Sequence, residues 1–265
     1  MTVRLATERV TAGIDTARGG RLESLIIDGS EVLGSLPVRD GPDWYRGIFP
    51  LAPWVGRLPG AHVKVGDIDF VVDVDGSEDA FHGVVSDVAW RVTSIGRTTV
   101  ELQCSFGPSH PGGWMIPGHA VQTYSLDDRA LSMTLTVSPA SQAMPASIGY
   151  HPWFVSVLDG RDAVVEFSPR QRLKPDGDAF VASADMGERP WDDLFTDLEA
   201  PPTIWWPGGP HLTLESSADI WVFYERMQGA FCIEPWTSPS GGFGEDTRLL
   251  LLGDSLSLDF TISFR

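Results

Sequence analysis

The sequence predicts an all-β protein that folds as one large antiparallel β-sandwich, and three observations lead to this prediction. Apolar and polar residues alternate in short runs bounded by turn residues, and this alternation dominates over the 3.6-residue period of a helix. The chain of 265 residues contains 28 glycines and 20 prolines, which disfavour long helices. Many of the runs follow one another at hairpin spacing. Because all-β folds of this length are often undivided, we expect residues 1–265 to form one domain.

The first half of the chain is predicted to consist of hairpin-linked strands. Residues 3–11 and 22–33 are expected strands, joined through Gly19-Gly20, and the second is broken by the Asp28-Gly29 turn. Two short strands flank Gly66-Asp67 within residues 61–74. Two further hairpins are predicted, 88–95 with 98–106 and 118–126 with 130–138.

The second half is predicted to contain a further series of strands. Their expected ranges are 162–167, 203–206, 211–215, 219–226, 229–234, 248–252 and 255–264. The last one alternates without a break, since Leu256, Leu258 and Phe260 are separated by serine and aspartate. Residues 185–197 are the one place where we expect a helical turn.

The charge balance excludes several classes of function. The chain has 36 acidic and 19 basic residues, a formal net charge of −17. Such a chain repels phosphate backbones and anionic lipid, so we expect no nucleic-acid partner and no membrane. The start, MTVRLATERV, lacks the apolar stretch of a signal peptide, and two cysteines are too few for a disulfide scaffold. We therefore expect a cytoplasmic protein, monomeric or homodimeric.

Four polar residues interrupt apolar segments where core residues would be expected. Arg57 lies in FPLAPWVGRLPG, where a guanidinium needs either a structural carboxylate or a polyhydroxyl ligand as acceptor. His82 precedes Gly83, which permits close approach of backbone and ligand, although a histidine in such a place is more often a hydrogen-bonded loop residue. His151 lies among aromatic residues before Pro152, so it is either a core histidine or a dry imidazole suited to proton transfer.

The fourth residue is Glu234, in the run FCIEPW. In a strand, Cys232 and Glu234 share a face. A carboxylate in such surroundings is costly unless it is paired or functional, and desolvation would raise its pKa. A structural salt bridge is the alternative. Cys232 is expected to be a buried packing residue, with sensitivity to thiol reagents as the other possibility.

We expect no metal ion, because the candidate ligands lack metal-site spacing. His82, His151 and Glu234 form no H-x-H, H-E-x-x-H or C-x-x-C motif, although dispersed metal sites do occur in β folds. The sequence contains no G-x-S-x-G, P-loop or dinucleotide fingerprint, and hence nothing indicates a bound nucleotide.

Taken in order, these segments resemble the aldose 1-epimerase (galactose mutarotase-like) family. The matching motifs are a proline-rich segment ending in Arg57, His82-Gly83 with a later tryptophan, Gly149-Tyr150-His151-Pro152-Trp153-Phe154, and Cys232-Ile233-Glu234-Pro235. The resemblance runs over about residues 10–264. It implies the galactose mutarotase-like supersandwich fold and the interconversion of the α and β anomers of a hexose or related aldose, without metal or cofactor.

The resemblance also implies roles for individual residues. Glu234 would be the base and His151 the acid of ring opening, while His82 would hydrogen-bond the ring oxygen or a neighbouring hydroxyl. Arg57 and an aspartate would orient the sugar. Within residues 189–195 we expect this aspartate to be Asp192 rather than Asp193, an Asp-rich turn or helix cap being the alternative.

Departures from the family pattern put the identity of the sugar in doubt more than the chemistry. Gly56 replaces an asparagine, Ser86 replaces an arginine, and Trp236 replaces a glutamine. Trp236 offers either a flat face for stacking on a pyranose ring or a core side chain, and the sequence does not distinguish these.

Other functions remain open at this level. Arg46, Arg57 and Arg248 could form a local pocket for a hexose phosphate, against the acidic balance of the chain. A non-catalytic carbohydrate-binding protein would need the cleft but no acid–base pair. A lyase or hydrolase would share the fold only, since hydrolysis calls for two carboxylates and only Glu234 is well supported.

Overall fold

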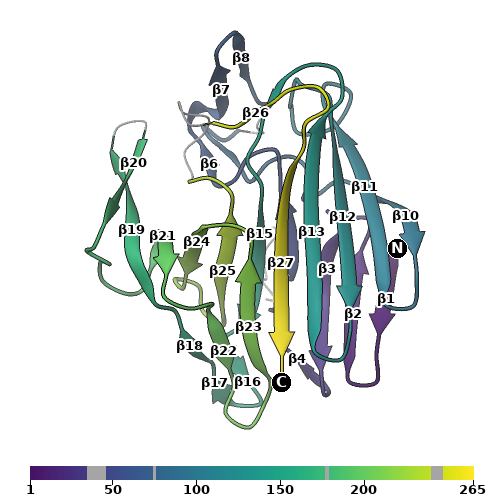
Figure 1. Ribbon diagram of the computed structural model, residues 1–265, viewed down its shortest axis with the longest axis vertical. Helices are drawn as coiled ribbons and strands as arrows, with labels where there is room; N and C mark the ends of the chain where they lie inside the picture. Colours follow the sequence, from purple (N-terminus) through teal and green to yellow (C-terminus); the bar gives the residue numbers. More distant parts are fainter. Residues whose placement is uncertain (35–45, 74–75, 177–178, 240–246) are drawn as a thin grey trace.

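Two large antiparallel sheets make up most of the molecule (Figure 1). The structure, a computed structural model, describes residues 1–34, 46–73, 76–176, 179–239 and 247–265. Across these residues the only helical element is the short 3-10 turn Pro59–Ala61, which confirms the all-β prediction. None of the described segments is a helix long and apolar enough to cross a membrane.

The larger sheet has eleven strands. Their order is β1 (Thr2–Ala6), β2 (Val10–Asp15), β3 (Arg21–Ile27), β5 (Ile48–Leu51), β15 (Gly149–Val155), β25 (Ala230–Trp236), β24 (Ile220–Tyr224), β21 (Asp192–Leu198), β19 (Pro169–Asp176) and β20 (Ala179–Ser183), with β4 (Ser30–Glu31) beside β3. Strands β15 and β25 are central, and nearly every residue in both is buried. The centre of this sheet is therefore covered on both of its faces.

The smaller sheet has eight strands and lies against one face of the larger one. Its order is β10 (Arg91–Ile95), β11 (Thr99–Phe106), β12 (Gly118–Leu126), β13 (Ala130–Pro139), β27 (Leu256–Phe264), β23 (His211–Ser216), β22 (Thr203–Trp205) and β18 (Val164–Glu166). In Figure 1, β12, β13 and β27 form the front layer, with β2 and β3 behind them.

Four two-stranded ladders complete the described structure. They are β6 (Arg57–Leu58) with β9 (Ala80–Phe81), β7 (His62–Val65) with β8 (Ile68–Val71), β14 (Met144–Pro145) with β26 (Leu249–Leu250), and β16 (Val157–Leu158) with β17 (Arg161–Asp162).

Both large sheets contribute to the main hydrophobic core. From β27, Phe260 is fully buried and contacts Tyr150 of β15 and Trp221 of β24, with ring centroids 5.9 and 6.4 Å apart. Two polar contacts add to this packing. The Tyr124 hydroxyl donates to the Gly20 carbonyl at 2.7 Å, and the Gln122 amide donates to Gly19 at 3.2 Å. These hydrogen bonds hold the β2–β3 turn against the smaller sheet.

Several alternating segments folded as the sequence predicts. The β10–β11 and β12–β13 hairpins lie close to the expected ranges, and Asp28-Gly29 forms a two-residue turn with positive φ at both positions. The single strand expected at residues 3–11 was wrong, because the chain forms two strands there, β1 and β2. The helical turn expected in residues 185–197 was wrong, because Asp192–Leu198 forms strand β21. Its residues pair with β19 on one side and β24 on the other, so sheet contacts outweigh the local Asp-rich turn signal.

Replacing Phe260 by alanine should destabilise the protein by about 3–5 kcal/mol, because a fully buried ring between the sheets is removed. Urea unfolding measures this loss. Thr261→Ala is the matched control, since its side chain is on the opposite face of the same strand, and it should cost about 0.5 kcal/mol. Equal losses in the two variants would contradict the packing described here.

Candidate functional site

A cavity of about 550 Å³ opens on the face of the larger sheet that points away from the smaller one. Its walls are formed by Phe49, Gly56, Arg57, Phe81, His82, His151, Trp153, Asp192, Leu194, Val222, Tyr224, Glu234 and Trp236. All six residues singled out from the sequence are among them. They come from distant parts of the chain, and the sheet brings them together.

Strand register explains why these side chains share one face. In the β15–β25 pair, Gly149 is opposite Trp236 and Trp153 is opposite Cys232, so the same register brings His151 beside Glu234. The pairing continues outward: His151 is opposite Phe49 of β5, and Glu234 is opposite Val222 of β24. Because side chains alternate along a strand, the residues between them face the main core instead.

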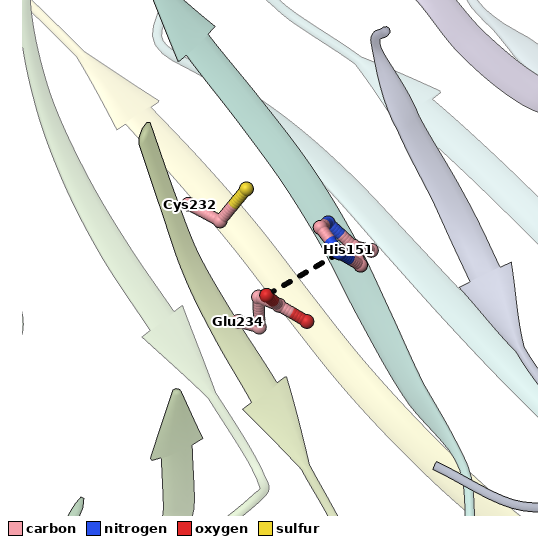
Figure 2. Close-up of side chains that lie close together, drawn as sticks. All are labelled: His151, Cys232 and Glu234. Carbon is pink, nitrogen blue, oxygen red and sulfur yellow. Dashed lines mark ion pairs between the residues drawn. The ribbon is translucent and has the colours of Figure 1, made fainter. Parts of the chain in front are cut away.

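His151 and Glu234 form a buried pair (Figure 2), and both line the cavity. Nε2 of His151 is 3.5 Å from Oε1 of Glu234, and the two residues are 9% and 2% exposed. The imidazole stacks on Phe49 and on Trp153, with ring centroids 4.7 and 5.1 Å away. These aromatic rings restrict its orientation and contribute to its burial.

Burial shifts both groups of this pair toward their uncharged forms. It raises the pKa of the Glu234 carboxyl well above its usual value, against the opposing hydrogen bond from Trp236. Burial lowers the pKa of His151 well below its usual value, and the charges of His82 and Arg21 lower it further. Burial therefore favours the protonated form of Glu234 and the neutral form of His151.

Trp236 is both a wall of the cavity and a partner of the carboxylate. Its indole N–H donates to Oε2 of Glu234 at 3.1 Å, and the residue is 4% exposed. Gly149 provides the space for the indole, because a Cβ there would lie 2.7 Å from Cδ1 of Trp236. The motif Gly149–Phe154 thus packs against Trp236, the residue directly after the motif Cys232–Pro235.

His82 is carried by a tight loop whose shape depends on Gly83. A Cβ at Gly83 would lie 1.8 Å from the Ala52 carbonyl oxygen, and its φ is +78°. The backbone N–H of Gly56 donates to Nδ1 of His82 at 3.3 Å, so the neutral ring carries its proton on Nε2. Burial lowers the pKa of His82 to about 4. Gly56 replaces the asparagine of the family pattern, and its backbone N–H makes this hydrogen bond within the site.

Arg57 lies at the rim of the cavity and not in apolar surroundings as expected. Its side chain is 58% exposed, forms an ion pair with Asp79, and lies over the ring of Phe81 at 4.6 Å. The expectation was wrong because β6 and β9 form a ladder that turns the arginine outward. Even so, the guanidinium lines the entrance, where a ligand would meet it.

The two adjacent aspartates face opposite sides of β21. Asp192 lines the cavity, and its carboxylate is 3.8 Å from Arg226. Asp193 is paired with Arg172 at 3.4 Å. Asp192 and Asp193 have different environments because side chains alternate along strand β21. The sequence did not indicate a strand at this position.

Sequence reasoning missed the aromatic walls of the cavity. Phe49, Trp153 and Tyr224 read as ordinary core residues, because an aromatic residue in a strand usually packs in the interior. One signal was available for Trp153, which lies two residues from His151 and therefore on the same face of its strand. Phe49 and Tyr224 lie opposite His151 and Asp192 on neighbouring strands. Cys232 likewise lies two residues from Glu234, on the same face. Its Sγ, one ligand atom of His151 and one of Glu234 all lie within 4.8 Å of one another.

A larger cavity of about 740 Å³ borders the same loop at Gly83. Ser86 is in its wall, so this departure from the family pattern does not adjoin the candidate site. None of the six predicted residues lines this cavity. The three arginines considered for a phosphate pocket are also separated: Arg57 lines the candidate site, Arg248 lines a third cavity, and Arg46 lines neither.

Comparison with known proteins finds both a family and a fold. Residues 1–166 match the family model described as aldose 1-epimerase. Arg57, His82 and His151 lie inside this span, and Asp192, Glu234 and Trp236 lie beyond it. No curated protein sequence matches the chain.

Several solved structures share the fold at low sequence identity. A putative aldose 1-epimerase from Escherichia coli matches with a TM-score of 0.81 and 16% identity, covering 100% of this chain and 99% of its own. A galactose mutarotase-like protein from Clostridium acetobutylicum gives 0.84 and 20%, covering 100% and 95%. Galactose 1-epimerase from Lactobacillus acidophilus gives 0.75 and 14%, covering 100% and 94%.

NMR titration of the histidine rings should show His82 with a midpoint near 4 and its neutral form protonated on Nε2. Because this value lies below the unfolded value, the contribution of His82 to stability is complete above about pH 6.5 and is lost as the pH falls toward 4. The variant His82→Asn assigns the signal. A midpoint near 6.5, or a proton on Nδ1, would contradict the described hydrogen bond.

Proposed function

This chain belongs to the aldose 1-epimerase family, and we propose that it is an aldose 1-epimerase that interconverts the α and β anomers of a hexose or related aldose. The observation that carries this proposal is the buried pair in the cavity, with His151 Nε2 3.5 Å from Glu234 Oε1. A binding protein needs no such pair, and keeping two ionisable groups buried is costly.

The reaction requires one proton to leave the C1 hydroxyl while another reaches the ring oxygen. Both oxygens are bonded to the same carbon, so the base and the acid have to lie close together. The 3.5 Å separation of His151 and Glu234 meets this requirement. After the C1–C2 bond rotates, the ring closes on the other face and both transfers run in reverse.

The pair needs a single proton to complete this cycle. Glu234 is the proposed base and His151 the proposed acid of ring opening, and each then serves in the opposite role during closure. Burial favours the proton on Glu234 in the protein alone, so the working state needs its transfer to His151. Sugar hydroxyls donating to the carboxylate, together with the Trp236 N–H, would stabilise the ionised Glu234.

The remaining predicted residues have positioning roles in this proposal. His82 is neutral at pH 7, so its Nε2–H donates to the ring oxygen or a neighbouring hydroxyl. Arg57 and Asp192 lie toward the rim and would hold hydroxyls away from C1. Trp236 positions Glu234 through its indole N–H, which gives it a role other than stacking on the sugar.

The cavity favours a free sugar over a sugar phosphate. The arginine at its rim is already paired with Asp79, and the carboxylate of Asp192 lines the same space. A phosphate dianion would be repelled by this carboxylate. Flat aromatic walls combined with a few polar groups are typical of sites for neutral small molecules.

Replacing Glu234 by glutamine should slow anomer exchange by about 100- to 10,000-fold, because the proton acceptor is removed while the shape is kept. Proton NMR starting from pure α-D-glucose and α-D-galactose measures the rate, at low buffer concentration because buffers also catalyse the reaction. Asp193→Asn is the matched control and should match the wild type, since Asp193 faces Arg172 and not the cavity. Equal rates for wild type and Glu234→Gln would remove Glu234 from its role.

Replacing Asp192 by asparagine should raise KM by about 10- to 100-fold and change kcat much less, because a charge-assisted hydrogen bond to the sugar is weakened. Saturation curves for Asp192→Asn and Asp193→Asn measure the contrast between adjacent positions. A large fall in kcat with an unchanged KM would instead place Asp192 at the reacting atoms.

A further inference from the structure

We propose that His151, Cys232 and Glu234 form a binding site for a borderline-soft divalent cation, with Zn²⁺ as the best fit. The three side chains lie together on neighbouring strands β15 and β25 (Figure 2). Cation binding there would occupy both members of the acid–base pair. The cation site stands on geometry alone, whereas its inhibitory effect on anomer exchange rests on the proposed function.

The geometry is close to that of a metal site before any movement. One ligand atom from each residue lies within 4.8 Å of the other two, and the His151–Glu234 distance is 3.5 Å. Bonds of about 2.0–2.3 Å in a tetrahedral zinc site place ligand atoms about 3.3–3.8 Å apart. The widest gap therefore has to close by about 1 Å when the cation binds.

The chemistry of the three ligands selects the class of cation. A thiolate, an imidazole and a carboxylate together suit zinc and similar transition metals, whereas magnesium and calcium require oxygen ligands. The charges also balance, since one thiolate and one carboxylate neutralise a divalent cation when the imidazole is neutral. That balance matters because all three residues are buried.

The surroundings leave these ligand atoms available. Oε2 of Glu234 accepts the Trp236 N–H, so Oε1 is the oxygen that faces His151. Cys232 is fully buried and is not part of a disulfide. His151 and Glu234 line the cavity, which gives the cation an entry path and a fourth position for water.

Inhibition follows from the shared residues. A cation on Nε2 of His151 and Oε1 of Glu234 removes the proton acceptor and the proton donor at once. Cys232 has no part in the proposed proton transfers, so its replacement separates metal binding from anomer exchange. Cys104, the other cysteine, is a matched control because it is also buried but lies in strand β11 of the smaller sheet.

Titration with Co²⁺, a coloured substitute for zinc, tests the site directly by visible absorption. The wild type and Cys104→Ala should bind one equivalent and show a thiolate-to-cobalt charge-transfer band, and Cys232→Ala should show none. Zinc affinity, measured by calorimetry, should fall at least about 100-fold in Cys232→Ala. Thermal melting curves and the milder Cys232→Ser variant establish that each loss occurs in folded protein.

A second readout tests the inhibition. Stoichiometric Zn²⁺ should slow anomer exchange by the wild type more than 10-fold, reversibly with a chelator, and leave Cys232→Ala active. Absence of the cobalt band in the wild type, or its survival in Cys232→Ala, would overturn the site. If the wild type exchanges no anomers, the proposed function fails while the cobalt spectrum still decides the metal site.

Discussion

The register between β15 and β25 is the constraint on which the site depends. Gly149 is opposite Trp236 and Trp153 is opposite Cys232, which sets His151 beside Glu234 on the cavity face. The intervening residues Tyr150 and Ile233 face the main core. A slip of one residue would send the polar pair into that core and the apolar residues into the cavity. The same alternation thus places the apolar residues in the core and the polar pair in the cavity, so a change of register would disrupt both.

The larger sheet can contain this buried polar pair because both of its faces are covered at the centre. On one side the smaller sheet supplies the apolar contacts of Phe260, and on the other a second cluster of buried side chains surrounds the cavity. Removing water from His151 and Glu234 disfavours their charged forms, so their unfavourable burial has to be offset by packing elsewhere. A dry site in turn strengthens each proton-transfer and hydrogen-bond interaction made with a bound sugar.

Alternation along hairpin-linked strands could be predicted from the sequence, and the fold class followed from it. Strands such as β13 and β27 have one apolar and one polar face, which is the pattern that sequence periodicity detects. Strand β15 escapes this rule because both of its faces are buried, and β21 because its pairing with β19 and β24 overrides an Asp-rich local signal. In the site, the polar residues could be found as interruptions of apolar runs. Cys232 was placed on the face of Glu234 by the same alternation, and Trp153 could have been placed beside His151 in this way. Phe49 and Tyr224 could not, since their positions depend on register between strands distant in sequence.

In the proposed function, His151 and Glu234 lie on either side of C1 of the bound sugar, and a crystal structure with D-galactose bound tests this geometry. We expect the sugar in the 550 Å³ cavity, with the C1 hydroxyl within hydrogen-bond distance of Glu234 and the ring oxygen within hydrogen-bond distance of His151. A sugar bound in the neighbouring cavity at Gly83, or with C1 directed away from both side chains, would contradict it.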